Sequence, residues 1–294
     1  RRYAYIGTGN LNAATARGYI DLGILTADVE LTQEVNEVFN VLTGSSGDAG
    51  FQHLLVSPFN MRRKFRELID REIEHAQTGR GGHIMIQMNG LADRRMIGAL
   101  YKAAASGVRI DMASREICCL RHGVPGLSDS VRVVSRLGRY LEHARIFKFG
   151  NAGTPEFFIG SADWMPRNLD RRVEALLPIT NATVHQQVLD QIMMANLLDN
   201  AIKYSPRHAG VNVVVSSTAD GVAISVVDEG MGLPDGMDVF EAFQRGDKDL
   251  VGATPGIGLG LHIVRNLVES RGGTVAAEGN PWRGSTFTVV LPHR

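Results

Sequence analysis

The residues best suited to chemistry lie on one face of a single predicted helix, residues 183–206. Asn196, Asn200, Lys203 and Tyr204 recur at i, i+4, i+7 and i+8, so they share that face. Two carboxamides and an ammonium group are poor core material unless something polar lies opposite them. An Asn carbonyl oxygen is a hard ligand for magnesium, and a lysine ammonium is a point charge for phosphate. This face predicts a site for a magnesium-bound triphosphate, and the alternative is a solvated helix face.

Both ends of this helix carry local signals. Thr183 followed by Gln186 has the form of a capping box, and Pro206 biases Ser205 out of the helical region. The apolar residues at helical spacing, which are expected to face a core, are Val188, Ile192, Ala195 and Ile202. One continuous helix is therefore predicted.

A second group of candidate ligands follows two predicted strands, residues 211–218 and 221–228, which a hairpin turn joins. Asp228 ends the second strand, where its carboxylate can accept a hydrogen bond from an exocyclic amine such as that of adenine. Gly230 and Gly232 then permit positive φ and a close backbone approach to a ligand. These residues predict a pocket for a base.

A glycine-rich turn, Gly256-Ile-Gly258-Leu-Gly260, runs into the next predicted helix. Such a turn presents backbone N–H groups and the positive end of the helix dipole to phosphate. The polar segment 247–255 before it is expected to be a lid. In the stretch 239–246, Phe240 and Phe243 are expected to share one helical face.

A third group of candidates lies nearer the N-terminus. His143 and Arg145 are two residues apart, so they are expected on one side of a strand. A His near a basic residue can attack phosphorus, or protonate a leaving oxygen, near neutral pH. Arg115 would add a forked donor for phosphate oxygens. From the residues alone, a structural role for His143 is the alternative.

Composition describes an ordinary globular protein of about two domains. The chain has 294 residues, 44% of them hydrophobic, and a formal net charge of zero, so it lacks the charge imbalance typical of nucleic-acid or anionic-membrane binding. Its two cysteines, Cys118 and Cys119, are adjacent, which favours a reducing, cytoplasmic setting over a disulfide framework. No apolar run approaches the ~18 residues of a membrane span. The start at Arg1, without Met, indicates a piece of something longer.

Strands and helices alternate before residue 180, which predicts an α/β domain. The expected strands are residues 51–58, 83–88, 108–113, 131–137, 143–150 and 156–163, and the expected helices are 61–79 and 93–107. After the glycine-rich turn, a helix ending at Gly272-Gly273 and strands at 274–279 and 285–292 are expected to close a second sheet.

Four stretches before residue 180 resemble polyphosphate kinase, which moves the terminal phosphate of ATP onto polyphosphate. They are residues 6–28, 115–130, 138–149 and 160–179, in matching order and spacing. The resemblance implies the end of one phospholipase D-like α/β domain, residues 1–46, and a whole second one, residues 47–182. It aligns Tyr19, Arg115 and His143 with nucleotide-contacting positions, and it places the family's phosphorylated His upstream of Arg1.

Several positions depart from that family. Tyr5 stands in place of a His, Glu116 in place of the Gly after the loop Arg, Gln87 in place of a Lys and His122 in place of a Pro. These changes remove or oppose positive charge, or alter the loop, whereas phosphoryl transfer depends on charge neutralisation and positioning. We therefore expect no polyphosphate synthesis by this region alone.

The stretches 196–206, 228–234, 239–246 and 256–264 resemble, in order, the N, first glycine, phenylalanine and second glycine boxes of sensor histidine kinases. The resemblance implies that residues 183–294 form a two-layer α/β sandwich of the histidine kinase/gyrase ATPase type, binding ATP and Mg²⁺. Asn200 would bind magnesium, and Asp228 would read adenine. The other implied nucleotide-binding residues are Asn196, Lys203, Tyr204, Gly230, Gly232, Gly256, Gly258, Leu259, Gly260 and Thr286.

The two resemblances meet within Asn196–Asn200, without a linker. None of the nine histidines lies in the sequence context of a histidine kinase phosphoacceptor. The leading hypothesis is a two-part ATP-linked phosphotransferase that binds ATP and polyphosphate and pairs with a second copy or a response regulator. The alternatives are an ATP-binding module without turnover, a signalling kinase whose acceptor His comes from another molecule, and a chimera without function.

Overall fold

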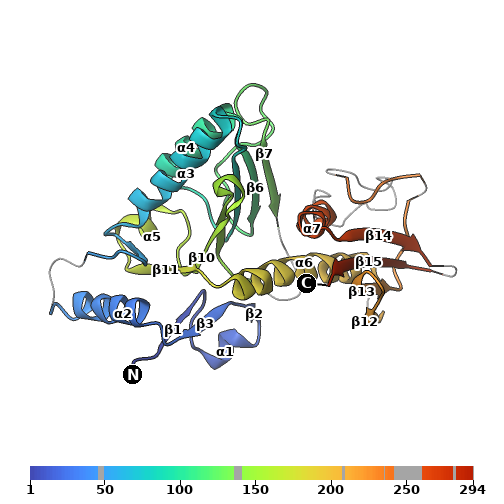
Figure 1. Cartoon of the computed structure of the whole chain (residues 1–294), viewed down its shortest axis with the longest axis horizontal. Helices are drawn as coiled ribbons and strands as arrows, with labels where there is room; N and C mark the ends of the chain where they lie inside the picture. Colours follow the sequence, from blue (N-terminus) through green and yellow to red (C-terminus); the bar gives the residue numbers. More distant parts are fainter. Residues whose placement is uncertain are drawn as a thin grey trace. The chain divides into compact units, whose positions relative to one another are not determined.

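The computed structural model describes residues 1–294 apart from 46–49, 136–140, 207–208, 235, 242–259, 281–282 and 294. Within the described elements, the side chains at 135, 182, 186, 189, 191, 192, 195, 199 and 203 also lie outside the description. The chain forms two compact units, Arg1–Asn181 and Ala182–Arg294 (Figure 1). Each unit has its own principal sheet.

A mixed seven-stranded sheet forms the centre of the first unit, in the order β4-β11-β10-β9-β5-β6-β7. Its strands are β4 (Leu55–Ser57), β5 (His83–Met88), β6 (Arg109–Ser114), β7 (Val131–Ser135), β9 (Ile146–Phe149), β10 (Glu156–Gly160) and β11 (Glu174–Ile179). β5, β6 and β7 run parallel, and the remaining pairs are antiparallel. The predicted pairing of β9 with β10 is confirmed, whereas β11 was not predicted.

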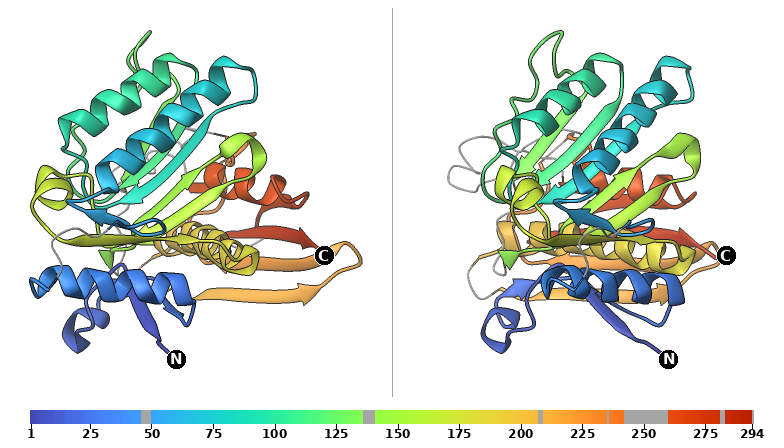
Figure 2. Two further views of the ribbon diagram at one scale, coloured as in Figure 1. Left: turned by 60° about the vertical axis from the view of Figure 1, so that its left-hand side comes forward. Right: turned by 90° about the vertical axis from the view of Figure 1, so that its left-hand side faces the viewer.

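Two long helices, α3 (Met61–Gln77) and α4 (Arg94–Ala105), lie side by side against this sheet (Figure 2). On α3, Phe65, Ile69 and Ile73 recur every four residues and are buried, as an amphipathic helix requires. Asp93 caps α4 by accepting a hydrogen bond from the Met96 N–H (3.0 Å). Both helices are confirmed.

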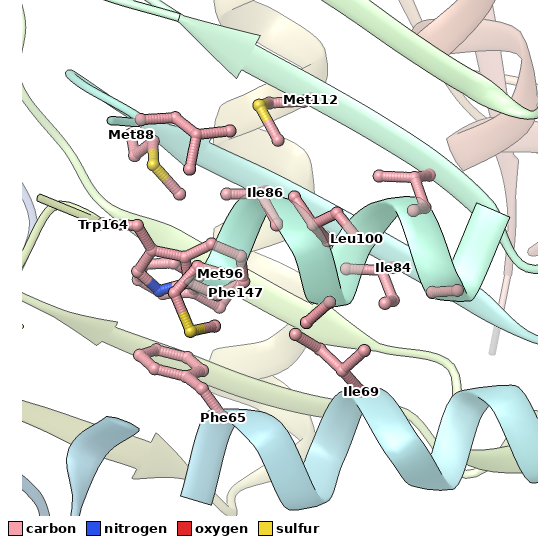
Figure 3. Close-up of a cluster of buried hydrophobic side chains, with 14 of the residues drawn as sticks. Phe65, Ile69, Ile84, Ile86, Met88, Met96, Leu100, Met112, Phe147 and Trp164 are labelled. Atoms are coloured by element: carbon pink, nitrogen blue, oxygen red, sulfur yellow. The ribbon is translucent and has the colours of Figure 1, made fainter. Parts of the chain in front are cut away.

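Aromatic side chains pack among aliphatic and methionine side chains in the core of this unit. Phe65, Phe147 and Trp164 are fully buried (Figure 3). The ring of Trp164 stacks on Phe147 (centroids 5.6 Å apart) and meets Phe65 edge-on (5.0 Å). One core is thereby shared by side chains of α3, of β9 and of the segment after β10. This core holds the ends of β5 and β9, next to His143 and Arg145.

The N-terminal segments include a hairpin of β1 (Ala4–Gly7) with β3 (Gly23–Thr26), followed by α2 (Val29–Leu42). A short parallel pair, β2 (Tyr19–Ile20) with β8 (Leu141–Glu142), joins chain segments far apart in sequence. The His143 N–H then donates to the Ile20 carbonyl oxygen (3.0 Å). The shorter elements of the unit are α1 (Ala13–Ala16), the 3₁₀ turn η1 (Asn151–Gly153) and α5 (Pro166–Asp170).

The second unit is a two-layer α/β sandwich. Its antiparallel sheet has the order β12-β13-β15-β14, and α6 (Ala182–Tyr204) and α7 (Gly260–Glu269) pack on it and on each other. The strands are β12 (Val211–Ser217), β13 (Gly221–Asp228), β14 (Thr274–Gly279) and β15 (Ser285–Pro292). The predicted hairpins are confirmed. No helix in the described parts of the chain is long and apolar enough to cross a bilayer.

Three local predictions for this unit are wrong. α6 begins at Ala182, so Thr183 lies inside its first turn and not at the predicted capping position before it. Ile202 is 54% exposed, although Val188 is buried as predicted. Phe240 lies in a turn, in which the Phe240 N–H donates to Asp238 Oδ1 (3.0 Å), and Phe243 lies outside the described residues. The core face of α6 holds Met193, Leu197 and Ala201, all fully buried.

Candidate functional site

A carboxylate that the sequence did not single out holds His143. His143 Nδ1 lies 2.9 Å from Asp21 Oδ1, which also accepts a hydrogen bond from the Thr8 hydroxyl (2.7 Å). Gly9 makes room for this arrangement, because a Cβ there would overlap the Asp21 carboxylate. The β2–β8 pair brings Asp21 to His143 from 122 residues away. No motif marks an Asp so distant in sequence, so Asp21 could not be found from the residues alone.

Arg145 lies against the His143 ring. Its Nη1 lies 3.0 Å from His143 Nε2 and 3.2 Å from Nδ1, and it donates to the Thr8 carbonyl oxygen (2.9 Å). The Asp21 acceptor favours the tautomer that carries its proton on Nδ1. Both residues lie between β8 and β9, outside any strand, so the prediction of a shared strand face is wrong. The predicted pairing of His143 with a cation is confirmed.

One chain of hydrogen bonds connects His143 to Arg115. The buried Arg145 donates to both oxygens of Asp163 (3.3 and 3.1 Å), and Asp163 Oδ1 accepts from the Asn89 N–H (2.8 Å). Asn89 Oδ1 in turn accepts from Arg115 Nε (3.0 Å). The two predicted residues therefore belong to one network at the ends of β5 and β6, a network of the kind that fixes side chains for anion binding.

Tyr19, the third predicted residue of this unit, packs against His143. Their ring centroids are 5.0 Å apart with the planes tilted by 56°. Tyr5, which stands in place of a family His, instead lies over Gly7 and Gly23 of the hairpin. Tyr19, His143 and Arg115 thus offer a ring, an imidazole and a guanidinium, the groups that could bind a base and phosphate oxygens.

The second unit builds a separate site around Asp228. Asp228 is buried, and its Oδ1 accepts hydrogen bonds from the N–H groups of Gly230 (2.7 Å) and Ser285 (3.2 Å). Burial raises the pKa of the Asp228 carboxyl, and the two N–H donors offset part of that rise. For Oδ2, the described residues provide no partner. One carboxylate oxygen is fixed, and the other can accept a hydrogen bond from a ligand.

Gly230 fits where a side chain would not. A Cβ there would lie 2.6 Å from both Asp228 Oδ1 and the Tyr204 carbonyl oxygen. Gly232 has a φ of +84°, and the neighbouring Met231 N–H donates to the Tyr204 carbonyl oxygen (3.3 Å). The two glycines therefore bring the loop after β13 onto the end of α6.

The two predicted asparagines of α6 meet the start of α7. A Cβ on Gly260 would lie 3.2 Å from Asn196 Oδ1 and 3.7 Å from Asn200 Nδ2. Asn196 is buried and hydrogen-bonded, and Asn200 is partly exposed. Gly260 thus lies against both asparagines.

Thr286 lies on β15 beside Asp228, where the Thr286 hydroxyl donates to Asn280 Oδ1 (2.8 Å) and Asn280 Nδ2 donates to the Asp228 carbonyl oxygen (3.3 Å). Asn280 is a further residue that the sequence did not reveal. Gly256, Gly258 and Leu259 lie outside the described residues, as does the side chain of Lys203.

Phe240 belongs to the wall of this unit. Its ring meets Phe287 edge-on (6.3 Å) and lies under the Arg265 guanidinium (5.0 Å). Arg265 also binds both oxygens of Asp238 (2.8 Å each). Phe240 is thereby attached to α7.

Comparisons with known proteins match both units. Residues 54–222 match the family described as Polyphosphate kinase C-terminal domain 2, and residues 1–48 match Polyphosphate kinase C-terminal domain 1. Residues 186–294 match Histidine kinase-, DNA gyrase B-, and HSP90-like ATPase.

The similar proteins include polyphosphate kinases of several bacteria. That of Thermosynechococcus vestitus is 50% identical over 198 residues, which are 67% of this chain and 27% of the relative. The chain thus spans about a quarter of such relatives. The crystal structure of polyphosphate kinase from Porphyromonas gingivalis has a TM-score of 0.64 and 40% identity, covering 67% of this chain and 31% of that one. Since the first family match covers more than half of its residues, the chain belongs to the polyphosphate kinase family, with polyphosphate kinase C-terminal domains fused to a histidine kinase-type ATPase domain.

Proposed function

We propose that the second unit binds ATP with magnesium and that Asp228 recognises adenine. The observation that carries this proposal is the Asp228 carboxylate, with Oδ1 fixed by the N–H groups of Gly230 and Ser285. Oδ2 is then oriented to accept a hydrogen bond from the adenine amine. Gly230 and Gly232 shape the pocket, and Thr286 supports it through Asn280.

Magnesium and phosphate would bind where the asparagines of α6 meet the start of α7. The residues that would hold them are Asn196, Asn200 and Lys203 with the backbone from Gly256 through Gly258 and Leu259 to Gly260. Asn200 would supply a carbonyl oxygen, the kind of hard ligand that magnesium prefers. The start of α7 would supply N–H groups to phosphate. When bound, magnesium neutralises charge on the phosphates.

For the first unit, the proposed ligand is a phosphate chain, either ATP or polyphosphate. Arg115 would bind phosphate oxygens, Tyr19 would contact the base, and His143 would be the catalytic residue that accepts or donates a proton, or attacks phosphorus. The proposed domains are residues 1–46, 47–182 and 183–294. A second copy of the chain or a response regulator is the proposed partner.

A binding-only role for the first unit has one observation in its favour. Arg145 Nη1 lies 3.0 Å from His143 Nε2 and 3.2 Å from Nδ1, so a cation of the protein already lies against the ring that would attack phosphorus. Incubation with γ-labelled ATP distinguishes the two roles, because phosphohistidine is labile in acid and stable in base. Such a label would support transfer, and its absence would favour binding alone.

The experiment that tests nucleotide binding is titration calorimetry of the full chain with ATP. Heat is expected with magnesium present, and Asn200→Asp should change the magnesium dependence more than the preference for adenine. No heat at millimolar ATP with magnesium would contradict the proposal.

A further inference from the structure

The guanidinium of Arg115 is already engaged along one edge. Its Nε donates to Asn89 Oδ1 (3.0 Å), and its Nη2 donates to Glu116 Oε1 (2.6 Å). Nε and Nη2 form one of the two edges of the guanidinium that can bind carboxylate or phosphate with two parallel hydrogen bonds, and Nη2 belongs to both edges. In the part of the chain that the structure describes, Arg115 has no other partner. A phosphate that approaches this edge meets Glu116 first.

The fold fixes Glu116 in that position. The buried Asn89 uses its side chain to hold Arg115, and its carbonyl oxygen accepts a hydrogen bond from the Glu116 N–H (2.8 Å). Asn89 is itself held by Asp163 through its own N–H (2.8 Å). The backbone of Arg115 and Glu116 is thereby braced against the end of β5, and the Glu116 carboxylate stays within reach of the guanidinium.

We propose that Glu116 is a specificity-determining residue of the first unit, which disfavours highly charged phosphate chains at Arg115. This inference rests on the proposed phosphate site. The Glu116 carboxylate competes for the Nη2 donor and repels the ligand, and the repulsion grows with the charge of the ligand. Tripolyphosphate therefore loses more affinity than inorganic phosphate does.

The Glu116 side chain is 47% exposed, whereas that of Arg115 is 15% exposed. An ion pair with one partner in solvent contributes little to stability, so the carboxylate can be displaced without unfolding the loop. Substitution of Glu116 should accordingly change ligand binding and leave the fold intact.

The test follows the Nε–H signal of Arg115 by NMR in the full chain, labelled with ¹⁵N and titrated at constant ionic strength. Arg115→Gln identifies the signal by its loss. Glu116→Gln removes the charge at similar volume, and Glu116→Gly also removes the contact. For both variants, we expect the midpoint of the titration at a concentration about tenfold lower than in the parent for tripolyphosphate, and about threefold lower for phosphate.

Glu67→Gln is the matched control. Glu67 pairs with Arg63 at the same distance, 2.6 Å, and its side chain is 49% exposed, but it lies on α3. The control should titrate like the parent. If Glu67→Gln gained as much affinity for tripolyphosphate as the Glu116 variants, the effect would come from net charge alone, and the proposal would be overturned. Parent-like titration of both Glu116 variants, or equal gains for phosphate and tripolyphosphate, would also overturn it. A signal from Arg115 that ignores tripolyphosphate in every variant would overturn the proposed phosphate site as well.

Discussion

The pairing of His143 with Asp21 shows what the residues could and could not predict. A His next to a cation is visible in sequence, because His143 and Arg145 are two positions apart. Asp21 is 122 residues away and reaches His143 only through the pairing of two-residue strands, β2 and β8. Strands this short carry no periodicity that could be recognised in advance.

Gly9 is the residue whose substitution tests that arrangement. Gly9→Ala places a methyl group on the Asp21 carboxylate, which Thr8 and His143 hold, so the first unit should lose about 1–3 kcal/mol of unfolding free energy. Gly18→Ala is the control, because among the described residues no atom apart from its chain neighbours lies within 4 Å of a Cβ there. Urea unfolding of both variants measures the difference. Equal stability of Gly9→Ala and Gly18→Ala would show that Asp21 moves away freely.

Asp228 should make the stability of the second unit depend on pH. Burial raises its folded pKa above the unfolded value of about 3.9, so the folded state holds the proton more tightly. The stability linked to this group is therefore present below pH 3.9 and is lost as pH rises through the folded pKa. Asp228→Asn removes that loss. The unfolding free energy of the variant minus that of the parent, measured with urea, should be larger at pH 7 than at pH 4. The same difference at both pH values would contradict this role of Asp228.

At the scale of elements, period and turn signals predicted most of the structure. Two local features illustrate this. Apolar residues recur every four positions on α3, and the Gly221 turn joins β12 to β13; the helix and the hairpin both form as predicted. β11 was missed because it contains Pro178, which cannot donate to a sheet and argues against a strand. The core face of α6 was misjudged because its apolar residues allow two faces, and only tertiary packing selects Met193, Leu197 and Ala201.

One buried carboxylate connects α2 to the segment before β4. Glu34 accepts hydrogen bonds from the N–H groups of Gln52 (2.8 Å), His53 (2.9 Å) and Leu54 (2.7 Å), across the proposed boundary at residue 46. Burial alone would raise its pKa, but the three N–H donors and the His53 side chain outweigh burial and lower the pKa below its ordinary value. α2 is thereby attached to the main body of the first unit.

Glu34→Gln should cost about 2 kcal/mol of unfolding free energy at pH 7. Because the folded pKa is lowered, this stabilisation is present above the unfolded pKa of about 4.3 and is lost as pH falls through the folded value. The difference between parent and variant, measured by urea unfolding, should shrink below pH 4.3. Glu30→Gln on the same helix is the control, since Glu30 is exposed and contacts only His53 among the described residues. A difference that stays constant down to pH 3 would contradict the role of Glu34.

On the scale of the whole molecule, α6 belongs to both families. The two family matches share residues 186–222, yet α6 forms one unbroken helix from Ala182 to Tyr204. Its buried residues Met193, Leu197 and Ala201 continue at a spacing of four through the place where the resemblances meet. Both family matches therefore cover the part of α6 that holds Asn196 and Asn200 beside Gly260.

The central claim is that the second unit recognises adenine through Asp228. The measurement is calorimetric binding of ATP and of GTP, with magnesium, to the full chain and to Asp228→Asn, each also carrying Arg115→Gln so that the proposed phosphate site of the first unit does not contribute. Guanine presents a carbonyl oxygen where adenine presents an amine, so it would face the Asp228 carboxylate acceptor to acceptor. Loss of a charge-assisted hydrogen bond worth about 1.5–3 kcal/mol should weaken ATP binding roughly ten- to a hundredfold. We expect the parent to bind ATP and reject GTP, and the variant to bind ATP weakly with little preference. A variant that binds ATP like the parent and still rejects GTP would contradict the claim.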